Sequence, residues 1–310
     1  MTRAGFVAVI GAPNAGKSTL VNRLVGSKVS IVTQKVQTTR FPIRGVAMAG
    51  DAQIVLVDTP GIFRPRRRLD RAMIRSAWGG AEGADAVVHL VDAEAELAAA
   101  SPKARAADRR SAEDVRTINE GLKAAKRPPI LALNKLDRVK AEDLLGLTER
   151  LFATGAYSEV FMISALKGSG VEDLRARLAA MMPEGPWFYP EDQAADLPAR
   201  LLASEITREK LYLRVHEELP YSASVETTAF EERPDGSVRI EQIVYVAREG
   251  HRPILIGKGG QTLKWIGEAS RKELSELLER PVHLFLTVKV KANWADERGL
   301  YRDLGLEFDV

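Results

Sequence analysis

GAPNAGKS, Gly11–Ser18, directly follows the apolar run FVAVI that begins at Phe6, and the rest of the chain is organised around it. It has the form GxxxxGK[ST], in which backbone N–H groups surround phosphates and the following helix adds its positive end. The next residues, STLVNRLVG, predict that helix, with Leu20 and Leu24 one turn apart and Gly26 ending it. A strand, a phosphate loop and a helix in succession predict an α/β domain.

Four more apolar runs have the length of buried strands: IVLV from Ile54, AVVHLV from Ala86, ILAL from Ile130 and VFMI from Val160. The segments between them can hold helices, which predicts parallel strands in a mixed, mostly parallel sheet. A polar loop follows each run at once, namely DTPG, DAEAE, NKLD and SALKG. Because open α/β sheets bind ligands at the carboxyl ends of their strands, these loops should surround one ligand.

Together with GAPNAGKS, three of these loops describe one guanine-nucleotide site: DTPG at Asp58–Gly61, NKLD at Asn134–Asp137 and SAL at Ser164–Leu166. NKLD adds recognition of the base. The carboxylate of Asp137 can accept two hydrogen bonds from N1–H and the exocyclic amine of guanine, a donor pair that adenine lacks. At roughly 1.5–3 kcal/mol for each charge-assisted bond, this residue provides roughly hundredfold discrimination or more. The predicted contacts with GTP or GDP are Gly11, Ala12, Pro13, Asn14, Ala15, Gly16, Lys17, Ser18, Thr19, Asp58, Thr59, Pro60, Gly61, Asn134, Lys135, Asp137, Ser164, Ala165 and Leu166.

The same loops predict a Mg²⁺ site beside the phosphates. Ser18 would offer its hydroxyl to the ion, and Asp58 would hold it through water. Between the phosphate loop and DTPG, QTTR supplies a switch threonine, with Thr39 the first choice and Thr38 the second. An ordinary pair of threonines at a strand edge is the alternative. The predicted metal residues are Ser18, Thr38, Thr39 and Asp58.

Lys17 is expected to bridge the β and γ phosphates, and the N–H of Gly61 to sense the γ phosphate, whose loss frees the loop. With an asparagine in the phosphate loop and the TTR switch, residues 3 to 182 resemble the GTPases of the Era and TrmE group. The water-orienting glutamine that follows DTPG in Ras-like enzymes is Ile62 here. In related GTPases an asparagine matching Asn14 coordinates K⁺, so the resemblance implies that K⁺ stimulates hydrolysis; a structural asparagine in a tight loop is the alternative. The residues expected to act in catalysis are Lys17, Asn14, Thr39 and Gly61.

An arginine-rich run, RPRRR at Arg64–Arg68, follows DTPG and continues with Arg71 and Arg75. This places it on the second switch of the predicted GTPase. A solvated loop is the plainer interpretation. Contact with RNA phosphates, or with a partner that depends on the nucleotide state, is the alternative.

The length of 310 residues predicts two domains, because single cores divide beyond about 250 residues. The GTP-binding domain is expected over 3–182. The segment 183–198, PEGPWFYPEDQAADLP, is rich in proline and acidic residues and predicts a linker. A smaller α+β domain is expected over 199–295, in the order helix, strand, strand, short helix, GKGG, helix, strand, and a C-terminal tail over 296–310.

GKGG, Gly257–Gly260, has the GXXG form with which KH domains clamp nucleotide backbones. The segment from Arg248 to Lys291 holds nine basic and five acidic residues, although residues 191–310 together hold 17 basic and 22 acidic ones. This local excess predicts a nucleic-acid groove; a helix with an ordinary solvated face is the alternative. The predicted RNA contacts, above an apolar floor of Ile254 to Ile256, are Ile256, Gly257, Lys258, Gly259, Gly260, Lys264, Arg271, Lys289 and Lys291.

The GTPase motifs, the YPED-containing linker and IGKGGQTLKWIGEASR together make the chain similar to the Era family nearly from end to end. The resemblance implies a type II KH domain that grips the 3′ end of 16S rRNA, slow GTP hydrolysis, and a role in assembly of the small ribosomal subunit. It also implies peripheral contact with the inner membrane, which the composition does not support independently. A TrmE-like component of RNA modification and a protein-binding switch without RNA are the alternative functions.

The composition restricts the remaining possibilities. There are no cysteines, which excludes disulfides and thiolate metal sites, and the four histidines are scattered. No apolar run approaches the roughly 18 residues of a membrane-spanning helix, so a cytoplasmic protein is expected. No obligate oligomer is expected, so the chain is taken as a monomer.

Overall fold

The computed structural model describes residues 1–124 and 128–310, which form two compact units. The first comprises Met1–Asp196 together with Leu304–Val310, and the second comprises Leu197–Asp303. The segment expected as a linker therefore belongs to the first unit almost to its end. The tail expected over 296–310 is divided, because its last seven residues pack with the first unit.

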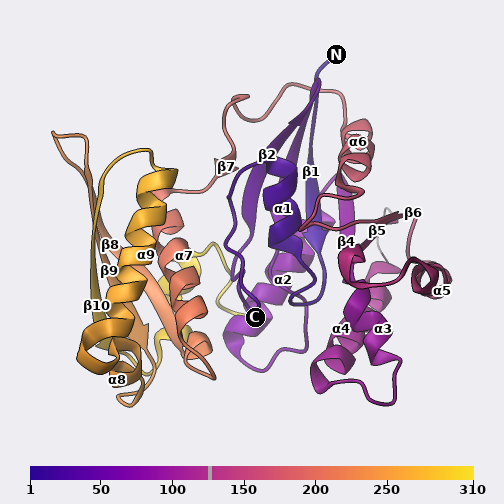
Figure 1. The fold of residues 1–310 in the computed structure, drawn as a ribbon. Coiled ribbons are helices and arrows are strands. Elements are labelled where there is room, and N and C mark those ends of the chain that lie inside the picture. The colour runs from indigo at the N-terminus through magenta and orange to yellow at the C-terminus, as the bar shows by residue number, and fades with distance from the viewer. Residues whose placement is uncertain (125–127) are drawn as a thin grey trace. The chain divides into compact units, whose positions relative to one another are not determined.

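The first unit is built on a seven-stranded sheet in the order β6-β5-β4-β1-β3-β2-β7 (Figure 1). Strands β1, β3, β4, β5 and β6 are parallel, whereas β2 pairs antiparallel with β3, and β7 antiparallel with β2. This confirms the mixed, mostly parallel sheet. The strands are β1 (Arg3–Ile10), β2 (Ile43–Ala49), β3 (Ala52–Asp58), β4 (Ala86–Asp92), β5 (Ile130–Asn134), β6 (Glu159–Met162) and β7 (Ala195–Asp196).

Helices cover both faces of this sheet because alternate residues of its strands are apolar on opposite sides. On β1, Val7 and Val9 pack with α1 and α6, whereas Ala8 and Ile10 pack with α2, α4 and α5. The Ala-rich stretch from Ala93 to Arg110 contains α3 and the start of α4. The helices are α1 (Lys17–Val25), α2 (Arg68–Glu82), α3 (Ala93–Ala99), α4 (Ala106–Leu122), α5 (Ala141–Phe152) and α6 (Val171–Met181).

The expected linker is fastened to β3 by one buried side chain. Gln53 accepts hydrogen bonds from the N–H groups of Phe188 (2.8 Å) and Tyr189 (3.0 Å) and donates to the carbonyl of Tyr189 (2.8 Å). The rings of Phe188 and Phe6 lie 5.0 Å apart. The proline-rich composition predicted a linker, but this segment is held against the sheet and ends in strand β7.

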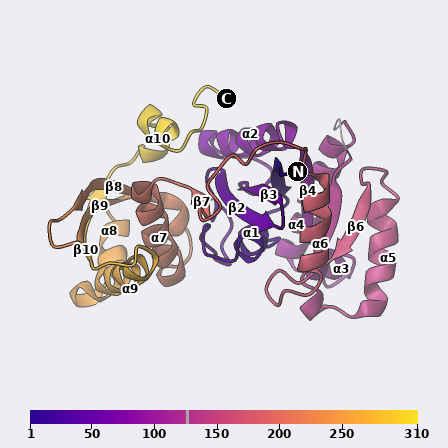
Figure 2. The same cartoon turned by 90° about the horizontal axis from the view of Figure 1, so that it is seen from above.

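The second unit has the chain order expected of a type II KH domain. Its three-stranded sheet runs β10-β9-β8, with β9 antiparallel to β8 and parallel to β10, and α7, α8 and α9 lie on one face (Figure 2). Every second residue of β9 is buried against these helices. No helix in the described parts of the chain is long and apolar enough to span a membrane. The elements are α7 (Ala199–Arg214), β8 (Ala223–Glu232), β9 (Val238–Val246), α8 (His251–Ile256), α9 (Gln261–Leu277), β10 (Val282–Val290) and α10 (Arg298–Asp303).

Candidate functional site

The phosphate loop lies between β1 and α1, where glycine is required by close backbone approaches. A Cβ atom at Gly11 would lie 2.4 Å from the carbonyl oxygen of Leu90, and one at Gly16 would lie 2.4 Å from Nδ2 of Asn134. Gly16 also has a φ of 102°, which L side chains rarely adopt. The loop can therefore bring its N–H groups close to an anion, at the N-terminus of α1.

Lys17 is held inside this loop with its ammonium bonded to the loop itself. Nζ donates to the carbonyls of Gly11 (3.1 Å) and Ala12 (2.9 Å), and the side chain is 6% exposed. Burial lowers the pKa of Lys17 to about 8, and the nearby Asp58 carboxylate partly offsets this effect. An incoming phosphate would supply the negative charge that this buried cation lacks.

Three oxygen groups converge where a magnesium ion is predicted. Ser18 Oγ lies 2.7 Å from Asp58 Oδ2 and 3.0 Å from Thr39 Oγ1, and Thr39 Oγ1 lies 3.3 Å from the same carboxylate oxygen. Asp58 is fully buried, and its Oδ1 has no hydrogen-bond partner among the described residues. Burial raises its pKa. Hard oxygen donors around an unpartnered buried carboxylate oxygen are what Mg²⁺ with a nucleotide would satisfy.

Thr38 points away from this cluster. Its hydroxyl contacts Thr33 Oγ1 at 2.6 Å and donates to the carbonyl of Lys35 at 2.7 Å. The geometry therefore favours Thr39 as the switch threonine. The sequence alone could not decide between these two adjacent threonines.

The DTPG loop is packed directly on the phosphate loop. Thr59 donates to the carbonyl of Val9 at 2.8 Å, and a Cβ atom at Gly61 would lie 3.0 Å from Pro13. The N–H of Ile62 donates to the carbonyl of Gly11 at 3.1 Å, and its side chain is buried in the core. Ile62 therefore contributes neither a polar side chain nor a free N–H to a water molecule in this arrangement.

Asn134 joins the phosphate loop to the base-binding loops. Its Nδ2 donates to the carbonyl of Ala15 (2.8 Å), and its Oδ1 accepts from the N–H of Ala165 (2.9 Å). Both bonds are buried. One side chain thus sets the distance between the phosphate-binding and guanine-binding parts of the site.

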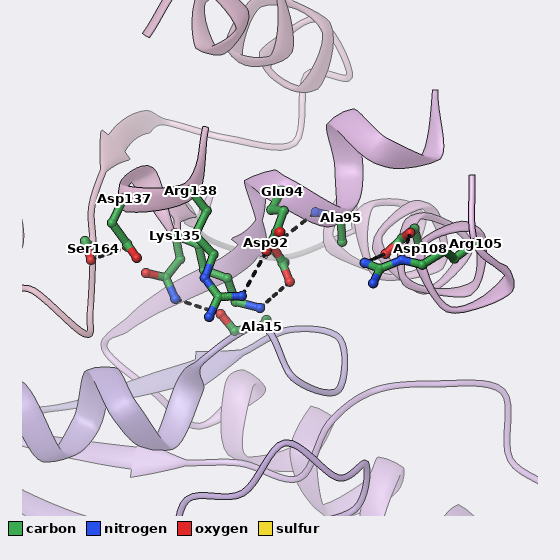
Figure 3. A network of polar contacts seen from close by, with 11 residues as sticks. Ala15, Asp92, Glu94, Ala95, Arg105, Asp108, Lys135, Asp137, Arg138 and Ser164 are labelled. Atoms are coloured by element: carbon green, nitrogen blue, oxygen red, sulfur yellow. Dashed lines mark hydrogen bonds and ion pairs between the residues drawn. The ribbon is translucent and has the colours of Figure 1, made fainter. Parts of the chain in front are cut away.

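The carboxylate predicted to recognise guanine, Asp137, is oriented by the SAL loop. Ser164 donates to Asp137 Oδ1 at 2.5 Å, and this hydrogen bond holds the pKa of Asp137 below its usual range. In Figure 3, Asp137 points towards Ser164, while Lys135 and Arg138 point towards the start of α3. The carboxylate is therefore ionised at neutral pH, as the predicted base contact requires.

Two partners of these loops were missed by the sequence analysis. Asp92, at the start of α3, forms an ion pair with Lys135, whose φ is 71°; the DAEAE loop after β4 was the signal that could have identified it. Arg23 of α1 donates to the carbonyls of Ala165 and Leu166. No motif marks this arginine, so only the structure identifies it.

Asn14 is exposed in the phosphate loop with a φ of 63°. Asparagine adopts this left-handed conformation more easily than most residues, which fits the structural alternative. Its side chain is nevertheless open to solvent beside the loop, as a cation ligand would have to be.

The GXXG segment forms a tight turn between α8 and α9. Gly257, Gly259 and Gly260 all have positive φ values, of 78°, 61° and 79°. A Cβ atom at Gly257 would lie 2.3 Å from Thr262 Oγ1, whereas one at Gly259 would meet nothing within 4 Å. A Cβ atom at Gly260 would also meet nothing within 4 Å, so the open side of the turn is at Gly259 and Gly260, where a phosphate backbone can approach.

The structure brings only some of the predicted RNA contacts together. Lys258, Lys264 and Arg271 are exposed on the turn and on α9. Lys289 alternates with the buried Val288 and so lies on the sheet face opposite the helices. Lys291 lies 4.8 Å from the ring of Tyr245, also on that face, and pairs with Glu297 at 2.6 Å.

Comparison with known proteins agrees with both units. Residues 6–135 match the family described as 50S ribosome-binding GTPase, and residues 218–295 match the KH domain family. The chain is 73% identical over 309 residues to GTPase Era of Caulobacter vibrioides, covering 100% of this chain and 98% of that protein. GTPase Era of Maricaulis maris is 59% identical over 308 residues, covering 99% and 98%.

The chain belongs to the Era family of GTPases. A structure of Era with MgGDPNP and nucleotides 1506–1542 of 16S ribosomal RNA superposes with a TM-score of 0.88 at 36% identity, covering 98% of this chain and 99% of that one. An Aquifex aeolicus Era variant bound to GDP and aluminium fluoride superposes with a TM-score of 0.84, also at 36% identity and the same coverage. Era-family membership thus confirms the predicted GTPase and KH architecture.

Proposed function

We propose that this chain is a Mg²⁺-dependent GTP switch whose KH unit binds the 3′ region of 16S rRNA during assembly of the small ribosomal subunit. The observation that carries the nucleotide part is the Asn134 bridge. Its side chain bonds Ala15 of the phosphate loop to Ala165, the neighbour of the serine that orients Asp137. The relative solved with MgGDPNP and a 16S fragment supports both parts.

In the proposed reaction each residue has a separate task. Lys17 holds the β and γ phosphates, and Ser18 and Thr39 provide hydroxyl oxygens beside Asp58. Bound Mg²⁺ supplies positive charge that neutralises the phosphates as the bond breaks. Gly61 places its N–H at the γ phosphate.

Asn14 is proposed to hold a K⁺ ion beside the phosphates, because Ile62 leaves the enzyme without a polar side chain at that position. Glycine tolerates the φ of 63° at Asn14, so Asn14→Gly removes the amide while keeping the loop conformation. Hydrolysis by the unmodified chain should be faster in KCl than in NaCl, and Asn14→Gly should abolish the difference. Equal rates in both salts would reject the potassium site, and a difference that survives in Asn14→Gly would show that Asn14 is structural.

The proposed RNA clamp consists of Ile256, the turn Gly257–Gly260, Lys258, Lys264 and Arg271. Gly259 offers a clean test because its Cβ position is open and asparagine and aspartate both tolerate its φ of 61°. Gly259→Asp and Gly259→Asn differ only in charge. Binding of the 1506–1542 fragment of 16S rRNA should fall at least tenfold more in the aspartate variant, at an effect of about 1.4 kcal/mol or more.

The control for this experiment is folding of the KH unit, monitored by circular dichroism. If both variants are folded and bind the fragment equally well, phosphate does not approach Gly259 and the clamp is wrong. If neither binds while both are folded, the extra side chain rather than its charge is responsible.

The GTPase family description and the Era structure name different ribosomal components. The family is described as 50S ribosome-binding, whereas the Era structure contains 16S ribosomal RNA. We follow the latter, because it aligns over nearly all of both chains and includes the KH unit.

The location and the oligomeric state stay predictions. Peripheral contact with the inner membrane rests on the family resemblance alone, and a cytoplasmic, monomeric state rests on the resemblance and the composition.

A further inference from the structure

The arginine face of α2, formed by Arg68, Arg71 and Arg75, is occupied by residues 304–310 of the same chain. Arg75 Nε pairs with Glu307 at 2.8 Å, and Arg71 Nε donates to the carbonyl of Val310 at 3.2 Å. The guanidinium of Arg68 lies 4.4 Å from the ring centre of Phe308. This segment and α2 belong to the same compact unit, and Figure 2 shows the end of the chain beside α2. The arginines singled out by the sequence therefore have an intramolecular partner.

The contact between residues 304–310 and α2 is weak enough to be reversible. Leu306 is buried to 7% exposure, but the Arg75–Glu307 pair is more than 60% exposed on both sides, where ion pairs contribute little. A cavity of about 840 Å³, lined in part by Ala72, Gly305 and Glu307, runs along α2. Gly305 and Glu307 thus form part of the wall of this cavity, and of residues 304–310 only Leu306 is buried.

The start of α2 is bonded to the first switch. The buried Asp70 accepts hydrogen bonds from the N–H groups of Arg66 (2.9 Å) and Arg67 (3.0 Å), and from Gln37 Nε2 at 3.0 Å. Gln37 lies two residues before Thr39, which faces the predicted magnesium position. A change at either switch therefore reaches α2, and through its arginine face the docked segment.

We propose that residues 304–310 are an intramolecular ligand of the arginine face of α2, docked in the GTP state and released in the GDP state. Docking coincides here with Thr39 turned towards Ser18 and Asp58, the arrangement that γ phosphate and Mg²⁺ favour. Residues 304–310 directly follow the RNA-binding unit, residues 197–303, in the chain. Their release would therefore detach the C-terminal end of that unit from α2.

Hydrogen–deuterium exchange of the full chain tests this inference without RNA, so its outcome is independent of the proposed RNA function. With GDPNP and Mg²⁺, peptides covering 304–310 and α2 should exchange about tenfold more slowly than with GDP, within the usual range of allosteric coupling. Glu307→Arg places a like charge against Arg75 and close to Arg71, so it should reduce the difference. Adding Arg75→Glu exchanges the charges of the pair and should recover the lost part.

Arg302→Glu is the matched control, because Arg302 pairs with its neighbour Asp303 and not with α2. It should leave the exchange unchanged. All variants are first checked for binding of fluorescent GDP, so that a defective nucleotide site is distinguished from lost docking. Equal exchange with GDP and GDPNP in the unmodified chain, or no rescue by the charge exchange, would overturn the proposal.

Discussion

Asn134→Ala should weaken nucleotide binding more than it weakens the fold. The change removes two buried hydrogen bonds, one to the carbonyl of Ala15 and one from the N–H of Ala165. Leaving a buried polar group unpaired costs about 1–3 kcal/mol, so the pair costs about 2–6 kcal/mol. The two groups belong to different loops, Ala15 to the phosphate loop and Ala165 to the SAL loop. Without the Asn134 side chain we expect these loops to separate and water to reach both groups.

If these loops separate, the free-energy cost of the lost hydrogen bonds appears in nucleotide binding and not in the stability of the fold. In the nucleotide-free protein, hydration relieves most of the penalty, so the unfolding temperature changes little. Binding must then restore the loop geometry, and the cost appears in the dissociation constant. We expect GDP affinity to fall between roughly 30-fold and 10⁴-fold.

Gln53→Ala is the matched control, since Gln53 is also buried and also bonds to backbone groups, but at residues 188 and 189. Calorimetric titration with GDP and thermal unfolding should give opposite patterns: Gln53→Ala loses stability and keeps affinity. If folded Asn134→Ala binds GDP within about threefold of the unmodified chain, the bridge has no role in binding.

The remaining predictions concern the base, the phosphates and the metal. Asp137→Asn should weaken GTP roughly a hundredfold or more and improve xanthosine triphosphate, measured by competition; an unchanged preference for guanine would reject the base assignment. Lys17 has a pKa of about 8 in the free protein, and bound phosphates raise it, so binding takes up a proton above that pH. GDP affinity should thus be constant below pH 8 and fall by up to about tenfold per pH unit above it; titrations with no such fall would contradict this. Thr39→Ala should lower Mg²⁺-dependent GDPNP affinity about tenfold or more while Thr38→Ala does not, and the reverse order would assign the ion to Thr38.

The sequence predicted the parallel strands because β1, β3, β4 and β5 are buried on both faces for most of their length and therefore read as apolar runs; β6, at the edge of the sheet, is half-buried. It did not predict β2, whose sequence IRGVAMA contains glycine and alanine in place of branched residues. The reason is packing: a Cβ atom at Gly45 would lie 2.7 Å from the side chain of Val25 on α1. Because the neighbouring helix requires a small residue at this position, β2 lacks the run of branched apolar residues by which a strand is predicted.

The sequence predicted the site residues that belong to short motifs. It did not predict those whose role depends on the direction in which their side chains point. Adjacent threonines differ only in which way the loop turns them, so Thr39 could be preferred but not assigned. Lys289 is a different case. The alternation in VHLFLTVKV already places Lys289 opposite the buried Val288, but counting basic residues along the segment disregarded that period.

Slow hydrolysis is expected from the way in which Ile62 packs on the phosphate loop. The N–H of Ile62 is bonded to Gly11 and its side chain is in the core, so neither can orient water while this contact persists. A cation in addition to Lys17 and Mg²⁺ could then stabilise the transition state, and Asn14 is an exposed polar side chain of the phosphate loop that could hold it. A cation there would act on charge that develops only during bond breaking, so K⁺ should raise kcat and leave the affinity for GDPNP unchanged. If K⁺ instead tightened GDPNP binding with kcat constant, the ion would be acting on the ground state and the catalytic assignment of Asn14 would be wrong.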